Sequence, residues 1–265
     1  MFFDYHVHSN FSSDSSMEMS ECIESAIERG IKELCFTDHL DIDYPGDVIF
    51  DFNYPRYKDS IESLQKKFGD KIRIKAGIEI GLQIHVLDET NTFLSDKEFD
   101  FIIGSIHAVN KKELYGGDFY KNKNKTQAYG EYLEYLYTCI KEFRNFDVLG
   151  HMDIVKRYGN YEDITLSYKD HVEMIETILK ELISTGRGIE VNTSGIRYSL
   201  GSPHPSMDIL KAYRRLGGEI ITIGSDSHAP SHLAAYFEDT YEALRECGFK
   251  YITSYDKRKP IQVLI

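Results

Sequence analysis

The chain has 265 residues, of which 42% are hydrophobic and 28% charged, so it can form one large α/β domain or two small ones. Its formal net charge of −12 argues against non-specific binding to nucleic acid or anionic membranes. The N-terminus lacks the basic segment of a secretory signal, and no segment approaches the roughly 20 apolar residues of a membrane span. Four scattered cysteines without a C-x-x-C pair favour buried, reduced thiols. We therefore expect a cytoplasmic protein with no membrane and no nucleic-acid partner.

Seven short apolar runs along the chain have the length and composition of strands. In chain order they cover residues 2–7, 33–37, 72–78, 99–106, 146–150, 188–191 and 219–224. Helical apolar stripes lie between them, at residues 17–29, 129–143, 172–183 and 209–216. Alternating strands and helices indicate an α/β fold with a parallel sheet, which can close into a barrel or stay open. No Pro-, Gly- or Ser-rich linker divides the chain, so we expect a single domain over residues 1–265.

Two stretches between these elements are predicted to be long loops at one end of the domain. The first covers residues 41–57 and is rich in Asp, Tyr and Pro, and the second covers residues 115–125. Long structured loops in α/β proteins often shape a pocket, so we expect these two to border the functional site.

Six of the ten histidines stand at or just after the C-terminal end of a predicted strand. They are His6, His8, His39, His107, His151 and His228. Two carboxylates share this position, with Glu79 after the third strand and Asp226 after the seventh. The C-terminal ends of parallel strands lie on one face, so these side chains are expected to converge there. Imidazole and carboxylate ligands together suit zinc, iron or manganese, and a carboxylate such as Glu79 can bridge two ions.

Six motifs extend this pattern into a family resemblance. They are D-Y-H-V-H-S (4–9), T-D-H (37–39), G-I-E (77–79), G-S-I-H (104–107), G-H-M-D (150–153) and G-S-D-S-H (224–228). From residue 4 to about residue 230, the chain resembles the polymerase-and-histidinol-phosphatase (PHP) superfamily. The segments F-T-D-H and V-N-T-S-G (191–195) look most like its histidinol-phosphatase branch. This resemblance implies a distorted (β/α)7 TIM-like barrel with a trinuclear site of divalent metal ions.

The resemblance also implies how the ligands are divided among three ions. The first ion would be held by His6, His8, Glu79 and Asp226, the second by Glu79, His107 and His151, and the third by Asp14, His39 and His228. Many relatives carry a histidine where this chain has Asp14. An oxygen ligand at that position favours a harder metal ion, so Asp14 sets the third ion apart from the other two.

The function implied by the resemblance is that of a phosphoric monoester hydrolase, a histidinol-phosphatase of histidine biosynthesis. Its partners would be a small phosphorylated metabolite, L-histidinol phosphate, and inorganic phosphate as product. The ions would activate a water molecule for in-line attack and neutralise the phosphate. Asp226 and His228 are the predicted catalytic residues, and the leaving group would take a proton from Asp226 or from a water at the ions. Arg157 and Arg197, on loops at the same face, are predicted to bind the phosphate through their planar guanidinium groups.

Other functions are compatible with parts of the pattern. The superfamily also includes nucleic-acid phosphodiesterases and phosphotyrosine phosphatases, but a nuclease would favour a long basic track, and residues 121–125 are the only short basic cluster. A non-catalytic metal-binding or interaction module would have lost ligands, whereas this chain keeps eight or nine. An amidohydrolase shares the H-x-H first strand but would carry a bridging lysine where this chain has Glu79.

Overall fold

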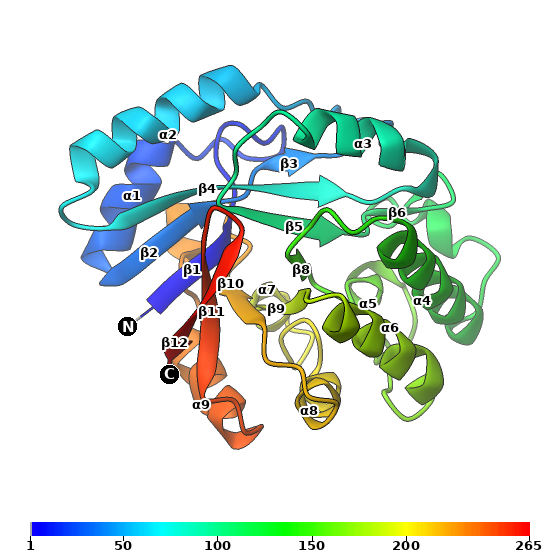
Figure 1. The fold of residues 1–265 in the computed structure, drawn as a ribbon. Coiled ribbons are helices and arrows are strands. Elements are labelled where there is room, and N and C mark those ends of the chain that lie inside the picture. Colours follow the sequence, from blue (N-terminus) through cyan, green and yellow to red (C-terminus); the bar gives the residue numbers. More distant parts are fainter. Residues whose placement is uncertain (1) are drawn as a thin grey trace.

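Seven parallel strands form the centre of the protein, in the same order along the sheet as along the chain. The computed structural model describes residues 2–265. The strands are β1 (Phe2–Val7), β2 (Ile31–Phe36), β4 (Arg73–Gly81), β5 (Phe101–Ser105), β8 (Val148–Leu149), β9 (Gly188–Asn192) and β10 (Ile221–Gly224), shown in Figure 1. A short additional strand, β3 (His39–Leu40), pairs with β4. All seven predicted strands are thus present, and they are parallel as expected.

The sheet closes into a barrel through hydrogen bonds between the segments that follow its first strand, β1, and its last strand, β10. The backbone N–H of His8 donates to the carbonyl of Ser227 at 2.9 Å, and the N–H of Ser227 donates to the carbonyl of His6 at 3.3 Å. Val7 and Ser227 thereby form a parallel bridge between the segments that follow β1 and β10. The parallel strands therefore form a closed barrel and not an open sheet. The prediction of a distorted (β/α)7 TIM-like barrel in a single domain is confirmed.

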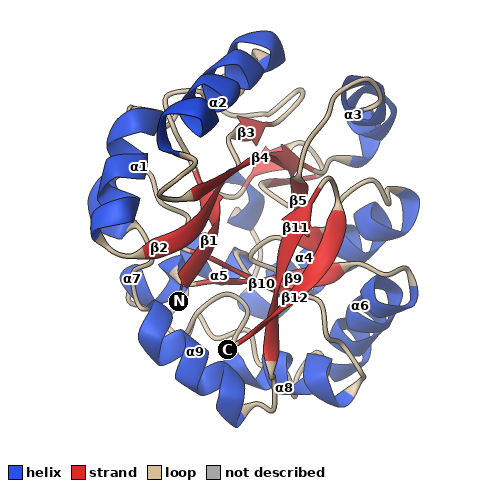
Figure 2. Cartoon of the chain, turned by 60° about the vertical axis from the view of Figure 1, so that its left-hand side comes forward, coloured by secondary structure: helices blue, strands red, loops and turns tan. Residues whose placement is uncertain are grey.

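Helices cover the outside of this barrel (Figure 2). They are α1 (Met19–Glu28), α2 (Tyr54–Phe68), α3 (Leu87–Leu94), α4 (Lys125–Glu142), α6 (Val172–Ser184), α8 (Met207–Arg215) and α9 (Phe237–Glu246). Most of them bury an apolar stripe, and α6 shows the pattern most clearly because it buries Ile175, Ile178, Leu179 and Leu182. Burial of each such side chain contributes roughly 2 kcal/mol to folding. The apolar faces of these helices therefore hold the connections between successive strands against the sheet.

The apolar stripes of the sequence do not predict α2, α3 or α9. The loop expected over residues 41–57 ends earlier, because α2 begins at Tyr54 and the side chain of Asn53 caps its first turn. This helix buries few side chains, namely Tyr57, Ile61 and Phe68, so its stripe is too sparse to stand out. The loop expected over residues 115–125 contains a short 3-10 turn, Asp118–Tyr120, and ends where α4 begins.

The N-terminal end of the barrel is covered by a hairpin of β11 (Tyr251–Asp256) and β12 (Lys259–Leu264), which lies across the strands in Figure 2. The backbone N–H of Tyr255 donates to the hydroxyl of Tyr5 in β1 at 2.7 Å. Arg258 pairs with Asp147, just before β8, at 2.5 Å. Because this hairpin covers the N-terminal end, the C-terminal ends of the strands are left as the face where a site can open.

Short elements shape that C-terminal face. The hairpin of β6 (Ala108–Val109) and β7 (Lys112–Glu113) follows β5, and the one-turn helices α5 (Val155–Tyr158) and α7 (Ser194–Arg197) follow β8 and β9. The 3-10 turn Pro230–His232 follows β10. The cysteines are free thiols, as predicted, and no helix within residues 2–265 is long and apolar enough to cross a bilayer.

Candidate metal centre

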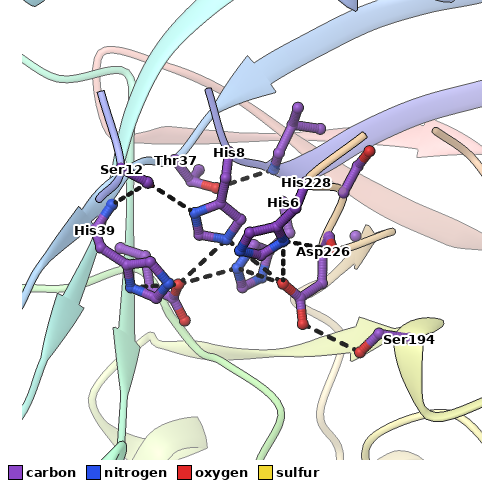
Figure 3. A network of polar contacts seen from close by, with 12 residues as sticks. His6, His8, Ser12, Thr37, His39, Ser194, Asp226 and His228 are labelled. Atoms are coloured by element: carbon purple, nitrogen blue, oxygen red, sulfur yellow. Dashed lines mark hydrogen bonds and ion pairs between the residues drawn. The ribbon is translucent and has the colours of Figure 1, made fainter. Parts of the chain in front are cut away.

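The residues predicted as metal ligands converge at the C-terminal ends of the strands. Figure 3 shows His6, His8, His39, Asp226 and His228 among them. Their potential donor atoms form four groups, and within each group these atoms lie within 4.8 Å of one another. The groups are His8–Asp14–His39–His228, His6–Glu79–His151, His6–His8–Asp226 and His39–Glu79–His107. Every one of the nine predicted ligands belongs to at least one group. The structure thus brings together all the residues that the strand-end pattern and the resemblance singled out.

Glu79 occupies the centre of this cluster and is fully buried. Its Oε2 faces the imidazoles of His6, His8 and His39 at 3.1, 3.5 and 3.2 Å, and its Oε1 faces those of His107 and His151 at 3.3 and 2.9 Å. The two oxygens of this carboxylate therefore face different histidines. Such an arrangement suits a carboxylate that bridges two metal ions.

Asp14 reaches the cluster from the loop after β1. Its Oδ2 lies 3.2 Å from Nε2 of His228 and 3.6 Å from Nε2 of His39. The side chains of Asp14 and His228 are 36% and 28% exposed, whereas that of His39 is 10% exposed. The group around Asp14 is therefore the part of the cluster that faces solvent.

Two of these residues have an unusual backbone conformation that directs their side chains. Asp226 has φ 53° and His151 has φ 21°, so both lie in the left-handed region. For residues other than glycine this conformation costs on the order of 1–3 kcal/mol and persists only when the surroundings impose it. Next to Asp226, Ser225 is held by the buried Asp4, which accepts hydrogen bonds from its N–H at 2.9 Å and its hydroxyl at 2.6 Å. Asp4 therefore helps to fix the turn that carries Asp226.

Three buried side chains outside the predicted ligand set orient the imidazoles. Glu190 contacts Nδ1 of His6 at 2.5 Å, Asp41 contacts Nδ1 of His107 at 2.8 Å, and Ser12 contacts Nδ1 of His8 at 3.1 Å. Each contact engages the Nδ1 atom and leaves Nε2 directed at the cluster, an arrangement typical of metal-ligating histidines. The place of Glu190 within the sixth predicted strand could have indicated a role near the cluster. Nothing in the sequence indicates that Asp41 contacts His107.

The charges of the cluster compensate one another. Burial by itself would lower the pKa of His6, but the carboxylates of Glu190 and Glu79 raise it well above its ordinary value. Burial would raise the pKa of Glu79, but the surrounding imidazoles hold it well below its ordinary value. The pKa of Asp226 is likewise lowered against the effect of burial, by nearby imidazoles and the guanidinium of Arg157. The carboxylates are therefore ionised and suited to binding cations.

His8 gives the clearest indication that the cluster fits metal ions. Its Nε2 is buried, lies at the centre of the histidines and has no hydrogen-bond partner within residues 2–265. Burial, followed by the charges of His228 and His39, lowers the pKa of His8 to about 3, so the ring is neutral. A neutral imidazole with an unpaired nitrogen aimed at ionised carboxylates is a ligand for a cation. The donor set of nitrogen and carboxylate oxygen fits zinc, iron or manganese.

Arg157 lies beside the cluster, on α5 rather than on the loop that was predicted. Its side chain is only 9% exposed, and its Nη2 lies 3.5 Å from Oδ2 of Asp226 and donates to the hydroxyl of Ser194. Its Nε is buried and lacks a hydrogen-bond partner in the described chain. The guanidinium also stacks on Tyr198, with 4.3 Å between Cζ and the ring centre. Arg157 thus offers a positive charge at the edge of the cluster.

Arg197 has a different environment, on the one-turn helix α7 instead of a loop. Its Nη1 donates to the carbonyl of Ser225 at 2.7 Å, and its Nη2 donates to the carbonyl of Asp226 at 2.8 Å. These two bonds support the turn that carries Asp226. Each of the two nitrogens keeps one more N–H, so a phosphate contact by Arg197 stays a prediction.

The basic cluster at residues 121–125 has acidic partners. Lys121 pairs with Asp118, Lys123 with Glu131, and Lys125 with Asp163. Each of its lysines is therefore neutralised by a carboxylate of the same chain. This surface is not a free basic track for a nucleic-acid backbone.

Comparisons with known proteins agree with this geometry. The PHP domain family matches residues 4–194. The histidinol-phosphatase of Lactococcus lactis subsp. lactis is 35% identical over 257 residues, which cover 97% of this chain and 95% of that protein. A protein of Clostridium acetobutylicum named "Probable histidinol-phosphatase" is 30% identical over 94% of this chain and 95% of its own length. The crystal structure of the histidinol phosphate phosphatase of Lactococcus lactis, complexed with zinc, L-histidinol and phosphate, has a TM-score of 0.91 with 34% identity and covers 98% of both chains.

Proposed function

The chain belongs to the PHP domain family, and from this premise we propose that it is a histidinol-phosphatase that hydrolyses L-histidinol phosphate to L-histidinol and phosphate. One observation carries the proposal. A relative with the same fold over 98% of this chain was crystallised with zinc, L-histidinol and phosphate. In this chain, a buried cluster of histidines and carboxylates lies at the C-terminal face of the barrel, with Arg157 beside it.

The proposed ligand sets follow the family resemblance, and all their residues lie in the four groups of the cluster, which differ from these sets by grouping His151 with His6 and His107 with His39. His6, His8, Glu79 and Asp226 would hold one ion, Glu79, His107 and His151 a second, and Asp14, His39 and His228 a third. Zinc is the ion to test first, because the Lactococcus relative was crystallised with it, and iron and manganese suit the same donors. When bound, such ions lower the pKa of water and neutralise the charge of a phosphate.

The protein's own groups position the phosphate and handle the proton. Arg157 supplies a guanidinium beside Asp226, and this planar group is the first proposed phosphate ligand. Arg197 holds the Asp226 turn in place and is the second proposed phosphate ligand. We assign proton transfer to Asp226 and His228: the ionised Asp226, 3.5 Å from Arg157, would take up a proton released by the attacking water and return it to the leaving group.

The first test is phosphate release by the protein purified without chelators. It should liberate phosphate from L-histidinol phosphate far faster than from a generic aryl phosphate, with metal content measured on the same sample. An equal or faster rate on the aryl compound would contradict the proposal. The same assay with a phosphotyrosine peptide and a single-stranded oligonucleotide covers the other activities of the superfamily.

A further inference from the structure

A carboxylate at the rim of the metal centre has no cationic partner. Glu113 ends the short hairpin of β6 and β7, which begins directly after His107 of the cluster. Its Oε2 accepts a hydrogen bond from the hydroxyl of Tyr44 at 3.1 Å. Glu113 forms no ion pair with any lysine, arginine or histidine of residues 2–265. It therefore carries a negative charge that the protein itself leaves unpaired.

The position of this carboxylate is fixed by two closely approaching loops. A Cβ atom on Gly46 would lie 2.6 Å from Oε2 of Glu113, and one on Gly116 would collide with its Oε1. Glycine at these two positions therefore allows both loops to pack against the carboxylate. Burial, followed by the charge of Glu113, raises the pKa of Tyr44 above its ordinary value, so its hydroxyl stays protonated and donates. The carboxylate is held in place and is half-buried rather than free in solvent.

Contacts of Tyr44, the partner of Glu113, lead to the cluster, and contacts of Tyr115, two residues after Glu113, lead to Arg157. On one side, the ring of Tyr44 lies 5.2 Å from that of Phe50, which lies 4.9 Å from the imidazole of His39. On the other side, Tyr115 lies 5.6 Å from Tyr158, whose hydroxyl is 3.4 Å from Nη1 of Arg157. Tyr115 is 76% exposed, so this side of the rim is accessible to a ligand.

L-Histidinol phosphate carries a primary ammonium group close to its phosphate. The phosphate end needs cations, which the metal centre and Arg157 would provide, whereas the ammonium needs an anion. The carboxylates inside the cluster already face histidines. On the nearby loop, Asp43 is paired with His85 at 2.8 Å and with Lys111 at 3.1 Å. Glu113 is the rim carboxylate that combines a fixed position with an unpaired charge.

We propose that Glu113, oriented by Tyr44, binds the ammonium group of the substrate and so selects L-histidinol phosphate among phosphate monoesters. This inference rests on the proposed histidinol-phosphatase activity. Tyr44 also places an aromatic ring next to Glu113, and aromatic faces attract cations. Glu113 is a specificity residue in this assignment, because it contacts the substrate away from the phosphorus and leaves the reacting atoms to the metal centre.

The test compares two substrates in the Glu113→Gln variant, which keeps the size of the side chain and removes its charge. One is L-histidinol phosphate, and the other is its analogue without the amino group, 3-(imidazol-4-yl)propyl phosphate. Loss of the charged contact should lower kcat/KM for L-histidinol phosphate by about 10- to 100-fold and change that for the analogue by less than about twofold. Metal content should equal that of the wild type. The inhibition constant of L-histidinol should rise by about the same factor as kcat/KM falls.

The matched control is Asp43→Asn, which removes the same charge from a neighbouring loop where the carboxylate is already paired. This variant should leave the ratio of the kcat/KM values for the two substrates unchanged. Asparagine tolerates the left-handed backbone of this position, where φ is 52°. The assignment of Glu113 is wrong if Glu113→Gln keeps the wild-type preference for L-histidinol phosphate over the analogue. It is also wrong if kcat/KM falls by the same factor for both substrates. Failure of the wild-type protein to hydrolyse L-histidinol phosphate would instead refute the proposed activity, so the two failures are distinct.

Discussion

Replacement of Arg157 by lysine tests whether this guanidinium binds the phosphate. The guanidinium is nearly buried, stacks on Tyr198 at 4.3 Å, and keeps a buried Nε–H without a partner in the described chain. Lysine retains the positive charge but not the planar pair of N–H groups that a phosphate can accept together. The substitution therefore separates the contribution of geometry from that of charge.

The structure allows the size of the effect to be worked out. A hydrogen bond to a charged group contributes about 1.5–3 kcal/mol, and lysine would lose one of two such bonds. The expected loss of about 2–3 kcal/mol in transition-state stabilisation corresponds to a fall of roughly 30- to 150-fold in kcat/KM. Initial rates of phosphate release from L-histidinol phosphate give this ratio, and the inhibition constant of inorganic phosphate should rise in parallel.

A matched control is Arg56→Lys. Arg56 also stacks on an aromatic ring, at 5.5 Å from the centre of Phe11, but lies on α2 outside the cluster. This control should keep kcat/KM within about twofold of the wild type, as expected for an exposed substitution without a special role. Because Arg157 also lies 3.5 Å from Asp226, metal content is measured in every variant. A variant Arg157→Lys with full metal content and wild-type kcat/KM would refute the assignment of Arg157 to the phosphate.

The remaining predictions concern the metal centre and the fold. His107→Ala should lower both metal content by elemental analysis and turnover, and full metal stoichiometry would remove His107 from the ligand set. Asp14→Ala should lose about one ion per chain, whereas Asp14→His should keep the metal content of the wild type, since an imidazole replaces the carboxylate. Tyr57→Phe removes a buried hydroxyl that accepts from the N–H of Gly77 at 3.1 Å and lies 3.0 Å from the carbonyl of Phe36. It should lower the free energy of unfolding in urea by about 1–3 kcal/mol, and an unchanged midpoint would contradict this.

The sequence predicts the seven strands and the position of the cluster because both depend on local pattern and chain order. His6 and His8 follow from the i, i+2 spacing of one strand, and Glu79 follows from its place at a strand end. Asp41 and Glu113 could not be found in this way, because their roles depend on contacts between loops that have no periodicity. The C-terminal hairpin was missed for a related reason, since Tyr5 meets Tyr255 across 250 residues. Local pattern thus predicts the strands and their ends, whereas the rim and the closing hairpin depend on tertiary packing.

The closure of the barrel and the assembly of the metal centre depend on the same contacts. The group His6–His8–Asp226 and the group around Asp14 each combine residues in or directly after β1 with residues after β10. The same two segments are joined by the backbone bonds between His8 and Ser227 that close the sheet. The matched PHP domain region ends at residue 194, before Asp226 and His228 are reached, so it contains only the ligands of the second proposed ion in full. Because binding to the folded state stabilises it, ions at the other two sites would stabilise the seam where the barrel closes. The strand that completes the barrel therefore also completes the site.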